Sequence, residues 1–233
     1  MDVNKPFDET RLFVMSEYIY FFMKCTFFFL LFNLPLLSAM IFFHVHPASF
    51  SWMVLAFMSL FMGPAWIVVL RVTGKALRER EIPKGSKLFL SSYVSHLGEG
   101  MFYWALYFIS FLILQFNKLY FLQMEGTFAL LAYVFTVLQL ALVTCALYTF
   151  AIVSRFYLHV HQTLKLSLWL MVRKLNQTVL MFAMLILCMV LLMKLNGLLS
   201  IFIGGIGYVM MRMMQPILQE IEECIQTGKD EVE

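Results

Sequence analysis

Six long apolar runs constrain the fold of this chain more than any other feature. They cover residues 18–43, 50–72, 100–116, 127–153, 178–194 and 198–214. About 20 consecutive apolar residues cross the hydrocarbon core of a bilayer as an α-helix. The whole chain is 62% hydrophobic and only 13% charged, whereas soluble domains are about half apolar and a quarter charged. We therefore predict an all-α fold, a polytopic transmembrane helical bundle with five to six spans.

The boundaries of three of these runs need separate consideration. The first run is long enough to form one helix that contains Asn33 and Pro35. The fifth and sixth runs are short and are joined by the sequence KLNG at 194–197. They form either two thin spans or one span followed by a re-entrant piece.

The distribution of Lys and Arg predicts the orientation of the spans. The connection at 71–99 carries six basic residues, and that at 154–177 carries four and no acidic residue. Cytoplasmic connections of membrane proteins are enriched in Lys and Arg. We therefore expect a multi-pass cell-membrane protein with both termini in the cytoplasm. The basic residues that we assign to the cytoplasmic interface are Arg71, Lys75, Arg78, Arg80, Lys84, Lys87, Arg155, Lys165, Arg173 and Lys174.

Two segments of this basic side resemble one another. Residues 86–106 and 164–184 align without gaps at an offset of 78, with about five identities, so chance similarity is the alternative to a true repeat. Each segment has apolar residues at helical spacing, namely Leu90, Tyr93, Val94 and Leu97, then Leu168, Met171, Val172 and Leu175. Each also leads directly into an apolar run. We predict two amphipathic helices at the cytoplasmic membrane interface.

Helix breakers interrupt the first two runs. The sequence FNLP contains Asn33 and Pro35, and the sequence GPA contains Gly63 and Pro64. A proline inside a helix frees a carbonyl that neighbouring groups must satisfy. The breaks either line a solute pathway, together with Gln139 of the fourth run, or shape the helical bundle. Asn33 and Gln139 can equally form hydrogen bonds between helices.

The sequence lacks the patterns that catalysis and metal binding require. It has no nucleophile elbow, no zinc-protease motif and no phosphate-binding glycine loop. His96 and Glu99 precede the third run without an evident partner, and the two HVH pairs are predicted on opposite membrane faces. No Asp or Glu falls in the middle of a run, which argues against ion-coupled transport. We expect no enzyme activity, cofactor, metal or nucleic-acid partner.

The two ends of the chain are more polar than the runs between them. Acidic residues outnumber basic ones before residue 18, so we expect no signal peptide. We predict a single membrane domain at 1–215 and an acidic cytoplasmic tail at 216–233 that starts at a helix-stopping Pro216. The tail can form a short amphipathic helix that docks on a partner or is merely solvated.

Several motifs resemble the YesL family of bacterial membrane proteins. They are LFNLPLL at 31–37, GPAWIVVLRVTGKALRE at 63–79 and KLFLSSYVSHLGEGMFYW at 87–104, and the similarity is clearest over residues 18–110. The resemblance implies a polytopic bacterial protein, often encoded near carbohydrate-uptake transporters, sensor kinases and polysaccharide-degrading enzymes. The matched positions Asn33, Pro35, Gly63, Pro64 and Ala65 have no known chemistry in that family.

These observations favour a non-enzymatic membrane protein that is an accessory or regulatory component of carbohydrate uptake or sensing. Its expected partners are the lipid bilayer and the membrane subunits of a sugar transporter or sensor kinase. The alternative is a small-solute channel or carrier whose pathway is lined by the broken first and second helices. A third hypothesis is a purely lipid-facing role of the basic helices. The sequence does not specify a solute or an oligomeric state.

Overall fold

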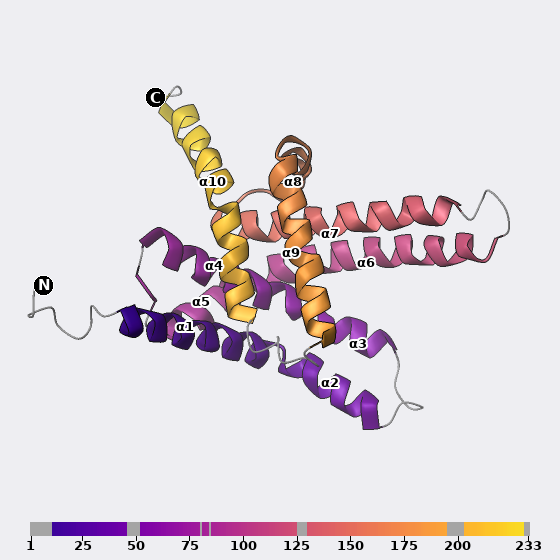
Figure 1. Cartoon of the computed structure of the whole chain (residues 1–233), viewed down its shortest axis with the longest axis horizontal. Coiled ribbons are helices and arrows are strands. Elements are labelled where there is room, and N and C mark those ends of the chain that lie inside the picture. The colour runs from indigo at the N-terminus through magenta and orange to yellow at the C-terminus, as the bar shows by residue number, and fades with distance from the viewer. Residues whose placement is uncertain are drawn as a thin grey trace, which may run out of the picture.

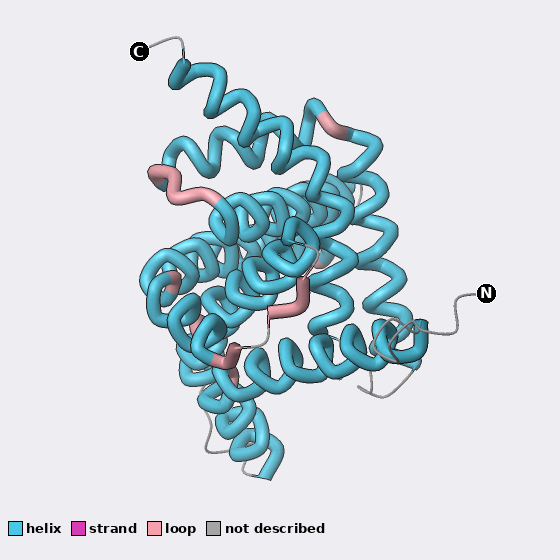
Figure 2. The backbone as a smooth tube through the Cα atoms, turned by 90° about the vertical axis from the view of Figure 1, so that its left-hand side faces the viewer, coloured by secondary structure: helices cyan, strands magenta, loops and turns pink. Residues whose placement is uncertain are grey.

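The structure, a computed structural model, describes residues 11–45, 52–79, 81–83, 85–124, 130–194 and 203–230. Within these residues the regular elements are all α-helices, joined by short loops and turns (Figures 1 and 2). The helices are α1 (Arg11–Phe32), α2 (Leu34–Val45), α3 (Trp52–Ser59), α4 (Met62–Glu79), α5 (Lys87–Ser95), α6 (Leu97–Leu122), α7 (Leu131–Arg155), α8 (Val160–Arg173), α9 (Leu175–Lys194) and α10 (Ile203–Asp230). The predicted all-helical fold is confirmed for the described part of the chain.

Four helical segments of the described residues are long and apolar enough to cross a membrane. They are Met15–Phe32, Val54–Glu79, Leu97–Leu122 and Leu131–Arg155. They correspond to the first four apolar runs, which confirms four of the predicted span candidates by length and composition. The fifth run lies in α9, and the part of the sixth run from residue 203 lies in α10, while residues 198–202 are outside the described residues. The crossing of the membrane by α9 and α10 stays a prediction.

The first apolar run is divided at Asn33, so the expectation of one continuous helix is wrong. Helix α1 ends at Phe32 and α2 begins at Leu34. Pro35 has no amide hydrogen, so the carbonyl four residues earlier loses its helical donor. The side-chain amide of buried Asn33 donates to the Phe29 carbonyl oxygen over 2.8 Å. The same oxygen also accepts the backbone amide of Asn33, so the side chain adds a second hydrogen bond beside the break.

The second break precedes the Gly-Pro pair. Helix α3 ends at Ser59 and α4 begins at Met62, so Pro64 lies in the first turn of α4. A helix has no internal acceptors for its first amide hydrogens, and proline is therefore tolerated there. A Cβ on Gly100 of α6 would lie 2.6 Å from Pro64 Cα. The glycine thus permits close backbone contact between α4 and α6.

Helix α4 lies between two apolar cores. On one side Ile67 and Leu70 pack in a cluster with residues of α6, α7, α8, α9 and α10. On the other side Val68 and Val72 pack with α1 and with Phe89 of α5. Beyond this centre, α6 and α7 lie side by side and extend away from the other helices (Figure 1). Because α4 belongs to both cores, it positions the elements around it.

Pro216 does not stop the last helix, contrary to the prediction. Helix α10 contains it and appears as one bent helix in Figure 1. The neighbouring Ile217 and Leu218 are buried in the core cluster that also holds Tyr148. Burial of these side chains compensates for the backbone hydrogen bond that proline removes. Helix α10 therefore connects the bundle directly to the acidic end of the chain.

The two similar segments have the same helical outline. Helix α5 ends at Ser95, His96 forms the junction, and α6 begins at Leu97. At the predicted offset of 78, α8 ends at Arg173, Lys174 forms the junction, and α9 begins at Leu175. Both junction residues have φ −106°. In the alignment of the two segments, the helix ends and helix starts of one therefore coincide with those of the other.

The contact between α4 and α6 predicts a clear effect of Gly100→Ala. The added Cβ meets the Pro64 backbone, so we expect the free energy of unfolding to fall by about 1–3 kcal/mol. Thermal unfolding of the detergent-purified protein measures the change. Gly98→Ala is the matched control, because no atom lies within 4 Å of its added Cβ. Equal stability of the two variants would contradict the close contact.

Candidate functional site

A cluster of polar side chains joins three separate segments of the chain. Arg71 of α4 donates to His96 Nε2 at the α5–α6 junction, and to the Tyr157 hydroxyl over 2.9 Å. The His96 ring stacks on the Tyr157 ring with 5.4 Å between centroids. The Arg71 guanidinium lies 5.6 Å from the centroid of the same tyrosine ring. We call Arg71, His96 and Tyr157 the basic junction.

The contacts of His96 define its protonation state. Its Nε2 accepts from Arg71, so the neutral ring carries its hydrogen on Nδ1. Nδ1 lies 3.5 Å from Oε2 of Glu99. Burial of the ring and the charge of Arg71 lower the pKa of His96, and the carboxylate of Glu99 opposes this effect only partly. The junction therefore holds a neutral histidine beside a permanent cation.

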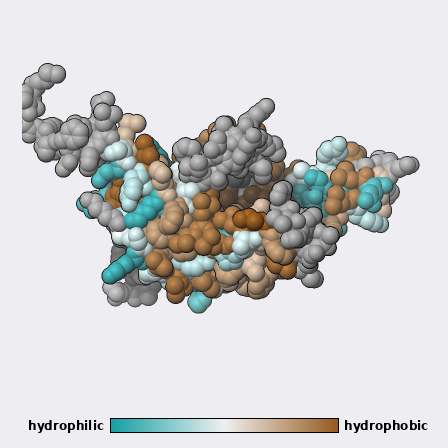
Figure 3. Space-filling view, turned by 90° about the horizontal axis from the view of Figure 1, so that it is seen from below, coloured by the Kyte–Doolittle hydropathy of each residue, from teal (hydrophilic) through white to brown (hydrophobic). Residues whose placement is uncertain are grey.

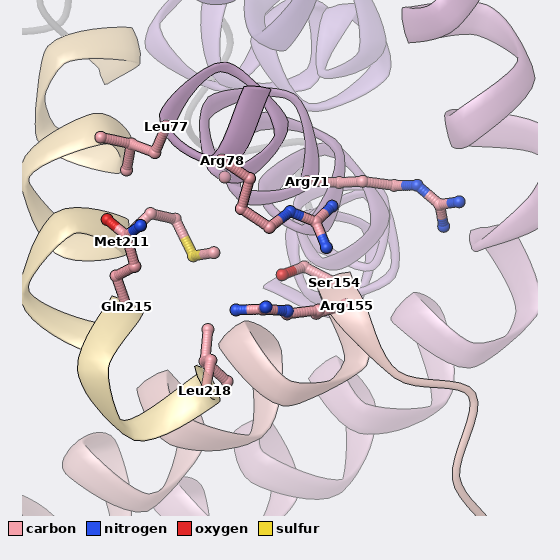
Figure 4. A pocket seen from close by; sticks show the side chains of 9 residues that line it. Arg71, Leu77, Arg78, Ser154, Arg155, Met211, Gln215 and Leu218 are labelled. Carbon is pink, nitrogen blue, oxygen red and sulfur yellow. The ribbon is translucent and has the colours of Figure 1, made fainter. Parts of the chain in front are cut away.

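Two further arginines face a small pocket next to the junction. The guanidinium groups of Arg78 and Arg155 point toward this space from α4 and α7, and Met211 of α10 lies across from them (Figure 4). Arg155 Nη2 donates to Glu222 of α10. The side chain of Arg155 is only 7% exposed, and its Nε is buried without a hydrogen-bond partner. The pocket is therefore basic.

A larger groove lies between α8 and α10. It has a volume of about 690 Å³ and an apolar floor with a charged rim. Lining residues are Leu158, Gln162, Lys165, Leu166, Trp169, Leu170, Arg173, Ile217, Glu220 and Ile221. At its edge, Lys174 Nζ donates to Glu220 Oε2 over 2.6 Å, which lowers the pKa of the exposed Glu220. The ion pair links the α8–α9 junction to α10.

The residues predicted for a solute pathway lie in separate contacts. Asn33 is at the α1–α2 break, and Gly63 and Pro64 lie against Gly100. Gln139 of α7 donates to Gln115 Oε1 of α6 over 2.7 Å. An apolar pocket of about 410 Å³ between α4, α6 and α7 is lined by other residues, among them Trp66, Trp104 and Phe150. The described contacts thus do not bring Asn33, Pro35, Gly63, Pro64 and Gln139 together.

The predicted interfacial basic residues divide into several groups. Arg71, Arg78 and Arg155 surround the small pocket, and Lys165 and Arg173 line the α8–α10 groove. Lys174 pairs with Glu220, while Lys75 Nζ lies 3.7 Å from Glu79 Oε1 within α4. Lys87 is exposed at the start of α5. Arg80 and Lys84 lie outside the described residues.

The sequence did not reveal the partners in the basic junction. His96 and Glu99 were noticed near the third run, but Arg71 is 25 positions from His96 and 86 from Tyr157. The one available signal was an arginine inside the apolar sequence WIVVLRV at 66–72. A charge at such a position requires polar partners nearby. Among the described residues, no group of three or more His, Cys, Asp or Glu side chains is arranged to hold a metal ion.

No protein-family model, curated protein or solved structure matches the chain. The resemblance to the YesL family therefore stays a prediction based on the motifs at 31–37, 63–79 and 87–104.

The neutral His96 predicts a loss of stability in acid. In the unfolded chain, His96 takes up a proton below about pH 6.5, the usual pKa of histidine. In the folded chain the pKa of His96 is lower, so acid favours the unfolded state. We therefore expect the thermal midpoint to fall as the pH drops through this range. His96→Gln should show a smaller fall over the same range in detergent. An identical pH dependence of the two proteins would show that His96 is not the responsible group.

Proposed function

We propose that this chain is a non-enzymatic, multi-pass membrane protein of the bacterial cell membrane, and that it is an accessory or regulatory subunit. The groove between α8 and α10 is the observation that carries this proposal. Its apolar floor includes Leu166 and Ile221, and its rim carries Lys165, Arg173 and Glu220. An apolar centre with a polar rim is the usual anatomy of a protein interface. The groove suits an amphipathic helix of a partner subunit.

Exposed apolar side chains support the placement of α5 and α8 at the membrane surface. Leu90 and Val94 of α5 are 52% and 72% exposed. Leu168 and Val172 of α8 are 52% and 66% exposed. Opposite faces of the same helices are buried in the bundle, through Phe89 in α5 and Leu170 in α8. Helices of this kind bury an apolar face at the lipid boundary.

The wider surface also fits a lipid environment. Figure 3 shows apolar residues gathered in the middle of one face, with more hydrophilic residues toward its ends. A large exposed apolar area is unfavourable in water and is typical of membrane contact. We propose that the basic sides of α5 and α8 lie at the cytoplasmic headgroups and that both termini are cytoplasmic.

The link to carbohydrate uptake or sensing rests on the family resemblance. It makes the membrane subunits of a sugar transporter or of a sensor kinase the proposed partners. A solute carrier with a pathway lined by the breaks in the first two runs is the alternative, although no described contact joins Asn33, Gly63 and Gln139. Flux of a sugar through liposomes that contain only this protein would favour the carrier instead.

Trp169 provides a test of the docking groove. Its ring is 47% exposed, and the Arg173 guanidinium lies 4.5 Å from the ring centroid. Exposed tryptophans at interfaces often dominate binding, so Trp169→Ala should reduce partner recovery from native membranes by about tenfold or more. Quantitative affinity purification measures the change. Leu168→Ala is the control, because the neighbouring Leu168 is also exposed but does not line the groove.

The recovered proteins decide the proposed function. Recovery of a transporter or kinase subunit that depends on Trp169 would support the accessory role. Recovery of neither class from native membranes, with the protein itself intact and abundant, would overturn it. An equal loss of partner recovery with Trp169→Ala and Leu168→Ala would place the partner on the lipid-facing side of α8.

A further inference from the structure

The small basic pocket joins the ends of two membrane-span candidates. Arg78 lies in the last turn of α4, and Arg155 is the last residue of α7. The third wall is α10, with Met211, Gln215 and Leu218. Figure 4 shows the Arg78 and Arg155 guanidinium groups directed toward the same space, while Arg71 extends away from it. Two cations thus converge where three helices meet.

The carboxylates of the described residues do not balance these cations. Glu222 pairs with Arg155, but no ion pair joins Arg78 to an acidic side chain in the described part of the chain. The positive charge of Arg78 acts directly on Arg155. Like charges at short range are unfavourable in a partly dry site, and a bound anion would relieve the repulsion.

The buried Arg155 also has an unused donor. Its side chain is 7% exposed, and Nε has no hydrogen-bond partner although it is buried. A buried donor without an acceptor costs about 1–3 kcal/mol. Structures keep such a group rarely, and a role in binding a ligand is one physical reason for it. Nε therefore indicates an acceptor from outside the chain.

We propose that Arg78 and Arg155 bind a phosphate group, either that of a lipid headgroup or free phosphate. Guanidinium groups stay charged and match phosphate oxygens through paired hydrogen bonds. Buried Arg155 forms the base of the site, and exposed Arg78 closes over the anion. Arg78 lies in the last turn of α4, and Arg155 is the last residue of α7. The ends of helices that span a membrane lie at the depth of the lipid phosphates.

Binding requires a small rearrangement of the pocket. The unfilled space is about 10 Å³, close to the room for one water molecule. Exposed Arg78 can move to admit a larger oxyanion. The Glu222 carboxylate beside Arg155 repels an anion, and its side chain is 42% exposed, so it has room to turn away. The phosphate then replaces the carboxylate at Arg155.

Calorimetric titration of the full chain in a maltoside detergent tests this site. One titrant is sodium phosphate at constant ionic strength, and the other is short-chain phosphatidic acid, with diacylglycerol as the neutral control. We expect Arg78→Gln to weaken phosphate-group binding by about tenfold or more, since it removes charge-assisted hydrogen bonds. Arg212→Gln removes the same charge from an exposed position of α10 that does not line the pocket, and it should leave binding unchanged.

The two titrants distinguish the sources of the phosphate group. Binding of both ligands, weakened by Arg78→Gln, identifies a general phosphate site. Binding of phosphatidic acid alone, with the same dependence on Arg78, identifies a lipid-headgroup site. Arg155→Lys keeps the positive charge beside Glu222 but removes the planar guanidinium with its paired hydrogen-bond donors. The variant should still fold, and it should bind the phosphate group more weakly. Absence of binding, or equal weakening by Arg78→Gln and Arg212→Gln, would overturn the proposal.

Discussion

The hydrogen bonds of Arg71 hold the basic side of this bundle together. Arg71 extends from α4, the helix shared by both apolar cores, to His96 and Tyr157. A guanidinium beside apolar helices is costly unless its charge and donors are satisfied. Nη1 of Arg71 donates to a neutral imidazole nitrogen and to a phenol oxygen, and the tyrosine ring lies beside the charge. His96 joins α5 to α6, and Tyr157 lies in the connection between α7 and α8. The side chain of Arg71 contacts both, and it therefore fixes the ends of four helices.

The two similar segments share one plan but are held by contacts with different helices. Each consists of an amphipathic helix, a one-residue junction and an apolar helix, with junctions at His96 and Lys174. His96 contacts α4, whereas Lys174 pairs with Glu220 of α10. Arg78 and Arg155 end the helices that precede the two segments and meet at one pocket. The basic residues therefore form contacts that order helix ends.

Hydrophobic pattern and charge predicted the helical fold and the first four span candidates, because run length is set by bilayer thickness. The pattern marked Asn33 and Pro35 as helix breakers, but it could not decide that α1 ends there or that α10 continues through Pro216, since tertiary contacts decide both. It proposed five pathway positions that the described contacts do not join. It also missed the partners of His96, because Arg71 and Tyr157 are distant in sequence and no periodicity relates them.

The central claim is that α5 and α8 lie on the same cytoplasmic membrane surface, held there through the basic junction. Spin labels at Val94→Cys and Val172→Cys test it most directly, in a reconstituted protein whose four native cysteines are replaced by alanine. The account predicts that both labels lie about 5–10 Å below the headgroup boundary. Both should be relaxed by an impermeant nickel complex added on the cytoplasmic side only. Labels at opposite surfaces, or either label in bulk water, would contradict the account.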